Sequence, residues 1–252
     1  MRLKSLVKKF LPRKVKTSIG RLLIEHRERE LGRLPLQQAF DEVYKHGMWK
    51  QGKSSSGLGS EGILAERYVE LVRDYTTKHN LRTVVDGGCG DFSVGSRLAP
   101  IFERYMALDV SPRIIASNKQ RYADLATQQV SFAVADMTET TFPAADLVLI
   151  RQVLQHLTNA QIGMILRNLD ASSWRRVLIS ESVQDPQNNQ SPNLDLPSHT
   201  VRTRTSLGSG VFIDKPPFSR PAKRIATFYA TADGEETSGG LLVMELNRDP
   251  VE

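Results

Sequence analysis

The chain has 252 residues, of which 40% are hydrophobic and 25% charged, and its formal net charge is +6. This composition excludes wholesale disorder and fibrous repeats, and no apolar run approaches the ~20 residues of a membrane-spanning helix. The single cysteine excludes an internal disulfide and a thiolate zinc cage, which indicates a reducing, cytoplasmic compartment.

The positive charge is concentrated at the start of the chain. Residues 1–33 hold 11 Lys/Arg and 3 Glu, a net of +8, whereas the rest holds 23 Lys/Arg and 25 Asp/Glu, a net of −2. Apolar residues at helical spacing predict a basic amphipathic arm over residues 1–33. The arm either packs on its own domain or a second subunit, or contacts an anionic membrane peripherally at its inner face, or contacts nucleic acid. Nucleic acid is the least favoured of these, because the remainder of the chain is slightly acidic.

Residues 34–80 are expected to form N-terminal helices and a Gly/Ser-rich segment. Apolar residues at 36, 40, 43 and 44 share one helical face, and those between 64 and 75 share another. The sequence GKSSSGLGSEG (52–62) lies between the two helices. It is either a linker or a flexible lid with an anion-binding turn.

From residue 81 onward, short apolar runs alternate with helical segments. Strands are predicted at 84–85, 105–108, 130–134, 146–150, 177–179, 225–229 and 241–246. Ser111, and Thr158 or Asn159, can cap two of the intervening helices. The alternation predicts an α/β domain over residues 81–252, with a mostly parallel seven-stranded sheet and helices on both faces. Sheets of this kind bind ligands beyond the carboxyl ends of their strands.

Glycine and acidic residues follow the first three predicted strands. The first strand runs into DGGCG (86–90), where Gly88 and Gly90 permit a tight turn and close approach of a ligand. The second strand ends at Asp109, where a carboxylate can accept both hydroxyls of a ribose. The third ends before Asp136, which can accept a hydrogen bond from an adenine amino group. Together these residues predict a site for an adenosyl cofactor.

Both NAD and S-adenosylmethionine (SAM) contain an adenosyl group, and three features favour SAM. The turn lacks the third glycine of GxGxxG, so it suits a pyrophosphate poorly. Asp86 lies inside the turn, where it would repel a pyrophosphate but help to hold the cationic amino-acid end of SAM. Asp136 supplies the acceptor on the adenine side.

These motifs resemble those of class I SAM-dependent methyltransferases. The matching segments are VVDGGCGDF (84–92), LDV (108–110), VADM (134–137) and LIRQVLQHL (149–157). The resemblance implies a Rossmann-like fold with SAM as cofactor, Gly88 and Gly90 under its methionine end, and Asp109 on the ribose. It also implies that Val110 and Met137 sandwich the adenine. Phe92 departs from the pattern, because many members have a third glycine there.

A narrower resemblance concerns the acceptor. FDEVY and the tryptophan after it (40–49), SGLGS (56–60), DGGCGDFSVG (86–95) and KPPF (215–218) are similar to a group of bacterial methyltransferases that are often encoded near polysaccharide or glycolipid biosynthesis genes. This implies methyl transfer to an oxygen or nitrogen of a small-molecule, sugar or glycolipid acceptor. The alternatives are an RNA methyltransferase that uses the basic arm and a non-catalytic, membrane-associated SAM-binding scaffold. The sequence has no HExxH motif or Cys/His cluster that would indicate a metal.

Two residues after the fourth strand are candidates for the chemistry. His156 is a candidate general base, because a neutral imidazole can take a proton from a hydroxyl or amine near pH 7. Its alternative role is to fix the loop through backbone hydrogen bonds. Arg151 faces the same region and either binds an anionic substrate or pairs with a neighbouring carboxylate.

Residues 183–224 form a long polar loop after the fifth strand, on the edge where a substrate would enter. Arg202 and Arg204 are two residues apart, which would place both on one side of an extended strand, with His199 just upstream. Such an arginine pair suits recognition of a carboxylate or phosphate. The alternative is a solvated edge strand.

Overall fold

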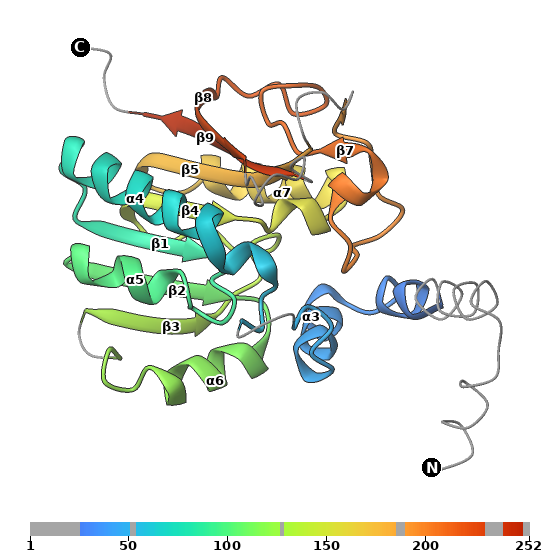
Figure 1. The fold of residues 1–252 in the computed structure, drawn as a ribbon, viewed down its shortest axis with the longest axis horizontal. Coiled ribbons are helices and arrows are strands. Elements are labelled where there is room, and N and C mark those ends of the chain that lie inside the picture. The colour runs from blue at the N-terminus through green and yellow to red at the C-terminus, as the bar shows by residue number, and fades with distance from the viewer. Residues whose placement is uncertain (1–25, 51–53, 127–128, 185–189, 230–238, 249–252) are drawn as a thin grey trace.

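Figure 1 shows the computed structural model of the chain, which describes residues 26–50, 54–126, 129–184, 190–229 and 239–248. Most of the predicted basic arm, residues 1–25, lies outside these residues, as do positions 51–53 at the start of the Gly/Ser-rich segment. Residues 26–31 are helical, and helix α3 (Leu36–Lys45) follows them.

A seven-stranded sheet with the order β3-β2-β1-β4-β5-β9-β8 forms the centre of the fold. Its strands are β1 Thr83–Gly87, β2 Arg104–Asp109, β3 Val130–Val134, β4 Ala145–Arg151, β5 Trp174–Val183, β8 Lys223–Tyr229 and β9 Gly240–Asn247. Neighbours from β3 to β5 pair in parallel, whereas β9 is antiparallel to both β5 and β8. The predicted mostly parallel, seven-stranded, Rossmann-like sheet is therefore confirmed.

Helices cover both faces of this sheet. They are α4 Gly62–Lys78, α5 Gly95–Leu98, α6 Pro112–Arg121 and α7 Asn159–Asp170, with short 3-10 helices η1 Leu58–Ser60, η2 Ala99–Ile101, η3 Leu154–His156 and η4 Arg204–Leu207. Ser111 caps α6, and Thr158 forms a capping box with Gln161 at the start of α7, as the sequence predicts.

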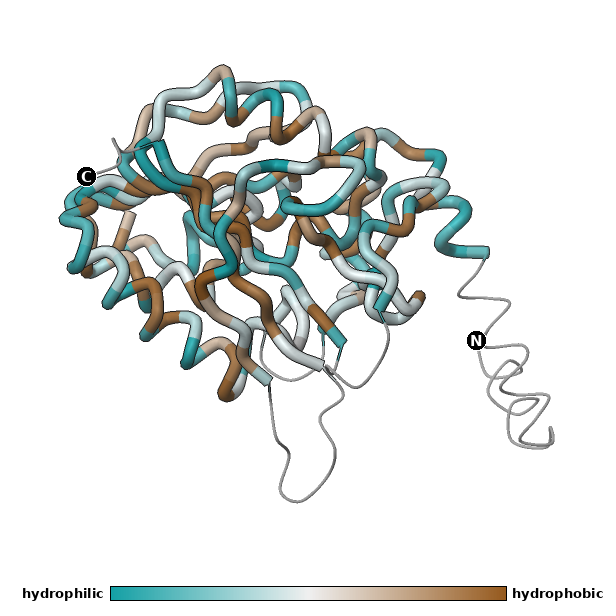
Figure 2. Tube along the Cα trace, turned by 90° about the horizontal axis from the view of Figure 1, so that it is seen from above, coloured by the Kyte–Doolittle hydropathy of each residue, from teal (hydrophilic) through white to brown (hydrophobic). Residues whose placement is uncertain are grey.

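The central strand β4 shows why two faces must be covered. Leu147 and Leu149 belong to the core beneath α4, α5 and α6, whereas Val148 and Ile150 belong to the core beneath α7. Because successive side chains of a strand point to opposite faces, a strand buried on both faces is apolar throughout. In Figure 2, the strands that cross the middle of the molecule are largely brown, and the helical turns around them alternate with teal.

The strand order fixes where a ligand can bind. β1 pairs with β2 on one side and with β4 on the other. Strands β2 and β3 therefore extend the sheet in one direction from β1, and β4 and β5 extend it in the other. A crevice forms at such a switch point, outside the carboxyl ends of the strands. The glycine-rich turn after β1 and the turn after β4 both border it.

The long loop packs against the domain over its described residues, 190–222. Its short strands β6 (Ser191–Pro192) and β7 (Ser209–Gly210) pair in parallel, and Leu196, Val211 and Ile213 are buried. The side chain of Asn193 accepts a hydrogen bond from the Phe212 N–H and donates one to the Phe212 carbonyl, both at 2.8 Å. Side-chain to backbone bonds of this kind hold the loop without a regular sheet.

The conformation predicted around Arg202 and Arg204 is wrong. Arg204 begins η4 and is fully buried, where its guanidinium donates to the carbonyls of Leu157 and Leu194. Arg202 pairs instead with Glu28 at 2.7 Å. A buried guanidinium requires hydrogen-bond acceptors. The start of η4 places Arg204 beside two backbone carbonyls, whereas Arg202 lies beside the Glu28 carboxylate.

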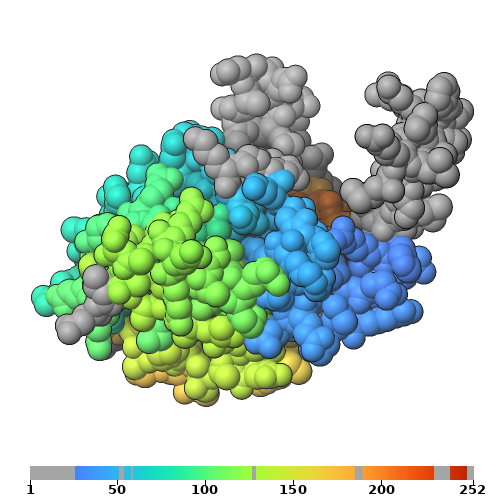
Figure 3. All heavy atoms as spheres, turned by 90° about the horizontal axis from the view of Figure 1, so that it is seen from below, coloured from blue at the N-terminus to red at the C-terminus, as the bar shows by residue number. Residues whose placement is uncertain are grey.

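The segment 26–49 docks across the domain. In Figure 3 these residues, in blue, lie against green residues of the β2–α6 region and orange residues of the long loop. Asp41 of α3 accepts hydrogen bonds from the Ser111 hydroxyl at 2.7 Å and the Arg113 N–H at 3.0 Å, at the start of α6. None of the helices within the described residues combines the length and apolar character needed to cross a bilayer.

Candidate functional site

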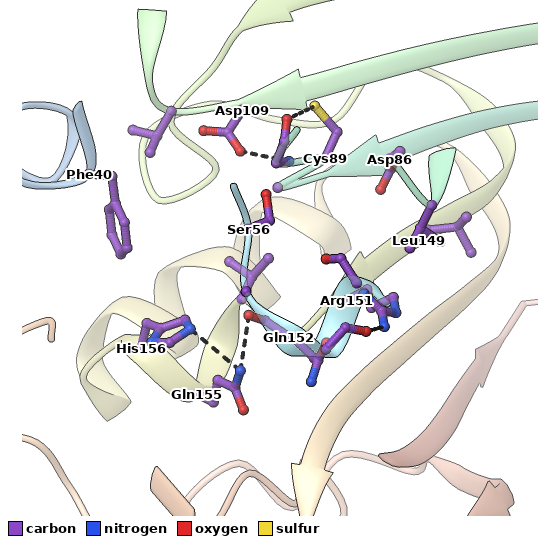
Figure 4. Close-up of a pocket in the computed structure, with 18 of the residues that line it drawn as sticks. Phe40, Ser56, Asp86, Cys89, Asp109, Leu149, Arg151, Gln152, Gln155 and His156 are labelled. Atoms are coloured by element: carbon purple, nitrogen blue, oxygen red, sulfur yellow. Dashed lines mark hydrogen bonds between the residues drawn. The ribbon is translucent and has the colours of Figure 1, made fainter. Parts of the chain in front are cut away.

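A cavity of about 400 Å³ lies at the carboxyl ends of β1, β2 and β4 (Figure 4). Its wall is formed by the turns after these strands, by α3 and by the Gly/Ser segment, which we define as Ser54 to Ser60. A cavity of this size suits a small molecule or cofactor. The cavity therefore occupies the position that the sequence predicts for the ligand.

The glycine-rich turn has the backbone shape that the sequence predicts. Gly88 and Gly90 have φ angles of 78° and 56°, in the left-handed region that favours glycine. A β-carbon at Gly88 would lie 2.3 Å from Val153, and one at Gly90 would lie 2.3 Å from the Ser56 hydroxyl. The turn is thus glycine-dependent because neighbouring chain segments approach it closely.

Phe92 keeps the glycine-like conformation without being glycine. Its φ is 59°, and its side chain is fully buried against the rings of Tyr105, Tyr122 and Phe132. A β-carbon at Gly95 would lie 2.3 Å from the Phe92 ring, so this glycine supplies the space. The departure from the family pattern therefore adds an aromatic core residue and leaves the turn in place.

Two buried carboxylates stand at the ends of adjacent strands. Asp86 accepts a hydrogen bond from the Tyr105 hydroxyl at 2.8 Å, and Asp109 accepts one from each of the Gly90 and Ser111 N–H groups, at 3.0 and 2.9 Å. Burial raises the pKa of each carboxyl to about 6. Since each carboxylate oxygen can accept two hydrogen bonds, both residues retain acceptor capacity toward the cavity.

The adenine-side candidates also line the cavity. Asp136 accepts the backbone N–H and the hydroxyl of Thr138 on one oxygen, at 2.8 and 2.7 Å, which leaves its other oxygen available. Val110 and Met137 contribute apolar side chains to the same wall. The structure thus brings together all seven predicted cofactor-binding residues.

Arg151 is a partly buried cation in the wall of the cavity. Its guanidinium donates to the Gly59 carbonyl and lies 5.1 Å above the Tyr68 ring. Its pKa is lowered by burial, against the attraction of Tyr68 and Asp86. Its Nε has no hydrogen-bond partner among the described residues, so the cation can still bind an anionic group.

The Gly/Ser segment is attached to the glycine-rich turn through Asp91. The Asp91 carboxylate accepts the Ser54 hydroxyl at 2.8 Å and the Ser55 N–H at 2.7 Å, and the Asp91 N–H donates to the Ser56 hydroxyl at 2.8 Å. Arg151 holds Gly59 at the other end. Figure 4 shows Ser56 between Asp109 and the turn that carries Gln152. The segment therefore lies across the cavity, where a lid would be.

His156 is neutral and lies in the cavity wall. Its Nδ1 is 3.0 Å from the Arg202 carbonyl, which can only accept, so Nδ1 carries the proton and Nε2 is the acceptor. Nε2 lies 3.4 Å from the carboxamide nitrogen of Gln155, and the ring packs 4.9 Å from the Trp49 ring. Burial lowers the pKa of His156 to about 4.

The three predicted substrate residues of the long loop do not line the cavity among the described residues. His199 is buried, with Nε2 3.1 Å from the Leu31 carbonyl, and it joins the long loop to the helical segment 26–31. Arg202 and Arg204 have the ion pair and carbonyl contacts given above. All three therefore join chain segments to one another outside the lining of the cavity.

Several residues in or next to the cavity wall were missed from sequence. Phe40, Tyr44 and Trp49 line the cavity from the N-terminal segment, and Asp91 and Gln155 lie in the two turns. The FDEVY motif and its tryptophan contain the first three, but these residues served only for the narrower resemblance and were assigned no role. Asp91 and Gln155 directly adjoin predicted site residues, so position after a strand was their only signal.

The residues present fit SAM. Carboxylates suit the ribose, the adenine amino group and the ammonium group, and Arg151 supplies a cation for the carboxylate. Three buried wall atoms, Ser93 Oγ, Arg151 Nε and Gln155 Oε1, have no hydrogen-bond partner among the described residues. Native proteins satisfy nearly all buried polar groups, so these atoms indicate a polar ligand. The described residues contain no group of three or more His, Cys, Asp or Glu side chains arranged to hold a metal ion.

Parts of the sequence match known proteins. The family described as a methyltransferase domain matches residues 84–172. Nodulation protein S of Sinorhizobium fredii is 28% identical over 114 residues, which are 44% of this chain and 52% of that relative. The chain thus matches about half the length of this curated relative.

Two solved structures are similar at low sequence identity. N-methyltransferase NodS from Bradyrhizobium japonicum, in complex with S-adenosyl-L-homocysteine (SAH), has a TM-score of 0.59 and 17% identity, over 83% of this chain and 100% of that one. Magnesium protoporphyrin IX methyltransferase from Synechocystis with bound SAH has a TM-score of 0.53 and 14% identity, over 83% and 97%. These likenesses show the fold. The domain match at residues 84–172, the strand order and the turns that carry the motifs agree with the resemblance to class I SAM-dependent methyltransferases that the sequence implies.

Proposed function

We propose that the chain transfers the methyl group of SAM to a nitrogen or oxygen of a small-molecule, sugar or glycolipid acceptor. The observation that carries this proposal is the cavity at the switch point, whose wall combines the three acidic strand ends with Arg151 and the buried His156. SAM, when bound, supplies an electrophilic methyl group on a sulfonium. The protein then has to align the acceptor with that group and exclude water.

Each cofactor contact is assigned by chemistry. Asp109 accepts the ribose hydroxyls, Asp136 accepts the adenine amino group, and Val110 and Met137 enclose the ring. Asp86 and Arg151 attract one another electrostatically, so they lie close enough to bind the two charges of one amino-acid group. We assign the ammonium to Asp86 and the carboxylate to the free Nε of Arg151.

The acceptor side is the aromatic wall formed by Phe40, Tyr44 and Trp49 beside His156. Flat aromatic faces with polar edges suit the partly apolar faces of a sugar ring. The name of the similar solved protein, N-methyltransferase NodS, supports nitrogen as the methylated atom.

The experiment combines calorimetry with labelling. We expect purified protein to bind SAM and not NAD, and Asp109→Asn to weaken SAM binding. Incubation with methyl-labelled SAM and cell extract, followed by fractionation, is expected to place label in the glycan or lipid fraction. Label in RNA would favour the RNA alternative. Binding of SAM without label in any fraction would favour the non-catalytic scaffold.

We further propose that the basic arm contacts an anionic membrane at its inner face, where a glycolipid acceptor would lie. The net charge of +8 over residues 1–33 supports this, since each Lys or Arg near such a surface contributes on the order of 1 kcal/mol. The full chain is expected to sediment with phosphatidylglycerol-containing vesicles and not with pure phosphatidylcholine vesicles, and added salt should release it. Equal sedimentation with both vesicles, or with neither, would contradict the proposal.

A further inference from the structure

The carboxamide of Gln155 lies in the cavity wall. Its nitrogen has hydrogen-bond partners, whereas its oxygen has none among the described residues. The side chain is 4% exposed. Its Nε2 lies 3.3 Å from the Gln152 carbonyl and 3.4 Å from His156 Nε2, and its Oε1 is buried without a partner among the described residues. Figure 4 shows both Nε2 contacts as dashed lines. Because Gln155 lines the cavity, a donor on a bound ligand is one group that can satisfy this acceptor.

The orientation of this amide follows from its neighbours. The Gln152 carbonyl can only accept a hydrogen bond. His156 Nε2 also accepts, because the Arg202 carbonyl fixes the proton on Nδ1. Two acceptors therefore face one end of the Gln155 carboxamide, and only its NH₂ can satisfy both. The carbonyl end is left as the acceptor.

The turn that carries Gln155 is held rigidly. Gln152 has a φ of 54°, a strained conformation for a non-glycine residue, and its side chain donates to the Ser182 hydroxyl at 2.9 Å. Glu181, fully buried on β5, accepts the N–H groups of Val153, Leu154 and Gln155 at 3.2, 2.8 and 3.1 Å. Strain and a buried anchor of this kind preorganise a site.

Building on the proposed methyl transfer, we propose that Gln155 is a catalytic residue that binds the acceptor. Its Oε1 accepts an N–H of a neutral amine and aims the nitrogen lone pair at the methyl group. His156 is then a positioning residue that holds the amide in this orientation through Nε2, and it is not the general base.

The chemistry favours an amine over a hydroxyl. The lone pair of the acceptor nitrogen forms the new N–C bond, the C–S bonding pair stays on sulfur, and the positive charge passes to nitrogen, which later releases a proton to water. A neutral amine needs no base before transfer, whereas a hydroxyl does. The His156 lone pair is already engaged by Gln155. An oxygen acceptor of N–H also stabilises the charge that grows on nitrogen.

The test compares two sugars and five proteins. D-glucosamine and D-glucose differ by an amine against a hydroxyl, and SAH formation is measured with each, at a pH where the amine is largely neutral. The proteins are the wild type, Gln155→Met, His156→Phe, His156→Asn and Gln120→Met. Gln120 is exposed on α6, so its variant makes the same chemical change away from the cavity. Calorimetry gives the SAM affinity of each protein.

We expect SAH from D-glucosamine and none from D-glucose. Gln155→Met should lower kcat/KM at least about tenfold and leave the Kd for SAM within about twofold, because one oriented hydrogen bond is lost. Gln120→Met should match the wild type. His156→Phe keeps an aromatic ring against Trp49 but loses the acceptor for Gln155, so its kcat should fall. His156→Asn offers both a donor and an acceptor, so its kcat should be higher than that of His156→Phe.

Three results would overturn the inference. One is full activity of Gln155→Met. Another is transfer to D-glucose alone, or to neither sugar, by protein that binds SAM. The third is a loss in His156→Phe of about 10²-fold or more with little effect of Gln155→Met, which would make His156 the base. Failure of the wild type to bind SAM would instead overturn the proposed function itself.

Discussion

Burial of Asp86 and Asp109 sets the pH range over which each carboxyl group ionises. Burial raises the pKa of both carboxyls to about 6, from the usual 3.8 of an aspartate. The fold therefore favours their protonated forms, so their contribution to stability is present at low pH and is lost as pH rises through about 6. Ligand binding has the opposite requirement, because an ammonium group and ribose hydroxyls are best held by carboxylates.

This opposition predicts a pH-dependent affinity. The Kd for SAM is expected to fall as pH rises from about 5 to 7, because Asp86 and Asp109 ionise over this interval. Calorimetry across the interval measures the change. In Asp86→Asn the remaining slope should be smaller, since one titrating carboxyl has been removed. An affinity that is flat across this range in the wild type would exclude a role for both carboxylates.

At the residue scale, chain position alone predicts that Asp109 lies at the cavity, and the structure places it there. Asp109 ends a parallel strand, so its side chain had to lie at the carboxyl edge whatever the details of packing. Gln155 and His156 could not be ranked in this way. Their roles depend on the Arg202 carbonyl, which belongs to a loop about 46 residues later and sets the tautomer of the ring.

The β1–α5 turn shows how one element accommodates an unusual residue. Gly95 leaves room for the Phe92 ring, so Gly95→Ala is expected to destabilise the protein by about 1–3 kcal/mol through overpacking. Urea unfolding measures this change. The double variant Phe92→Leu, Gly95→Ala should lose less than the sum of the two single variants, because the smaller side chain relieves the clash.

Gly163→Ala is the matched control for this prediction. Gly163 lies inside α7, and a β-carbon there would come no closer than 3.5 Å to Arg167. Alanine at this position should stabilise the helix by about 0.5–1 kcal/mol. Equal effects of the two substitutions would show that the space beside Phe92 is not limiting.

The Gly/Ser segment is predicted to be a lid that Asp91 latches. Asp91→Ala removes the acceptor of Ser54 and Ser55, so hydrogen exchange over residues 54–60 should rise and the Kd for SAM should increase roughly tenfold. Asp74→Ala, an exposed change on α4, is the control. Unchanged exchange in Asp91→Ala would mean that other contacts hold the segment.

At the scale of the whole molecule, Trp49 connects the N-terminal segment with the domain. Its Nε1 donates to the Val201 carbonyl at 2.9 Å, and its ring packs 5.6 Å from Phe40 and 4.9 Å from His156. Trp49→Ala should therefore loosen the segment, the long loop and the cavity wall together.

The expected loss is about 2 kcal/mol of unfolding free energy for Trp49→Ala, since the ring is partly buried. Trp49→Phe should lose only about 1 kcal/mol, because the hydrogen bond is removed and most of the ring packing stays. Urea unfolding followed by circular dichroism measures both. A wild-type stability in Trp49→Ala would show that the N-terminal segment folds onto the domain without this residue.

The sequence by itself determined the sheet, its glycine-rich turn and the acidic strand ends. These features depend on local periodicity and on residues next to strands, so alternating apolar runs and a few glycines were sufficient. The tertiary structure alone decided the rest of the site. Trp49, Asp91, Gln155 and Arg204 take their roles from partners distant in the chain. Such contacts form only after the segments pack, and periodicity along the chain carries no record of them.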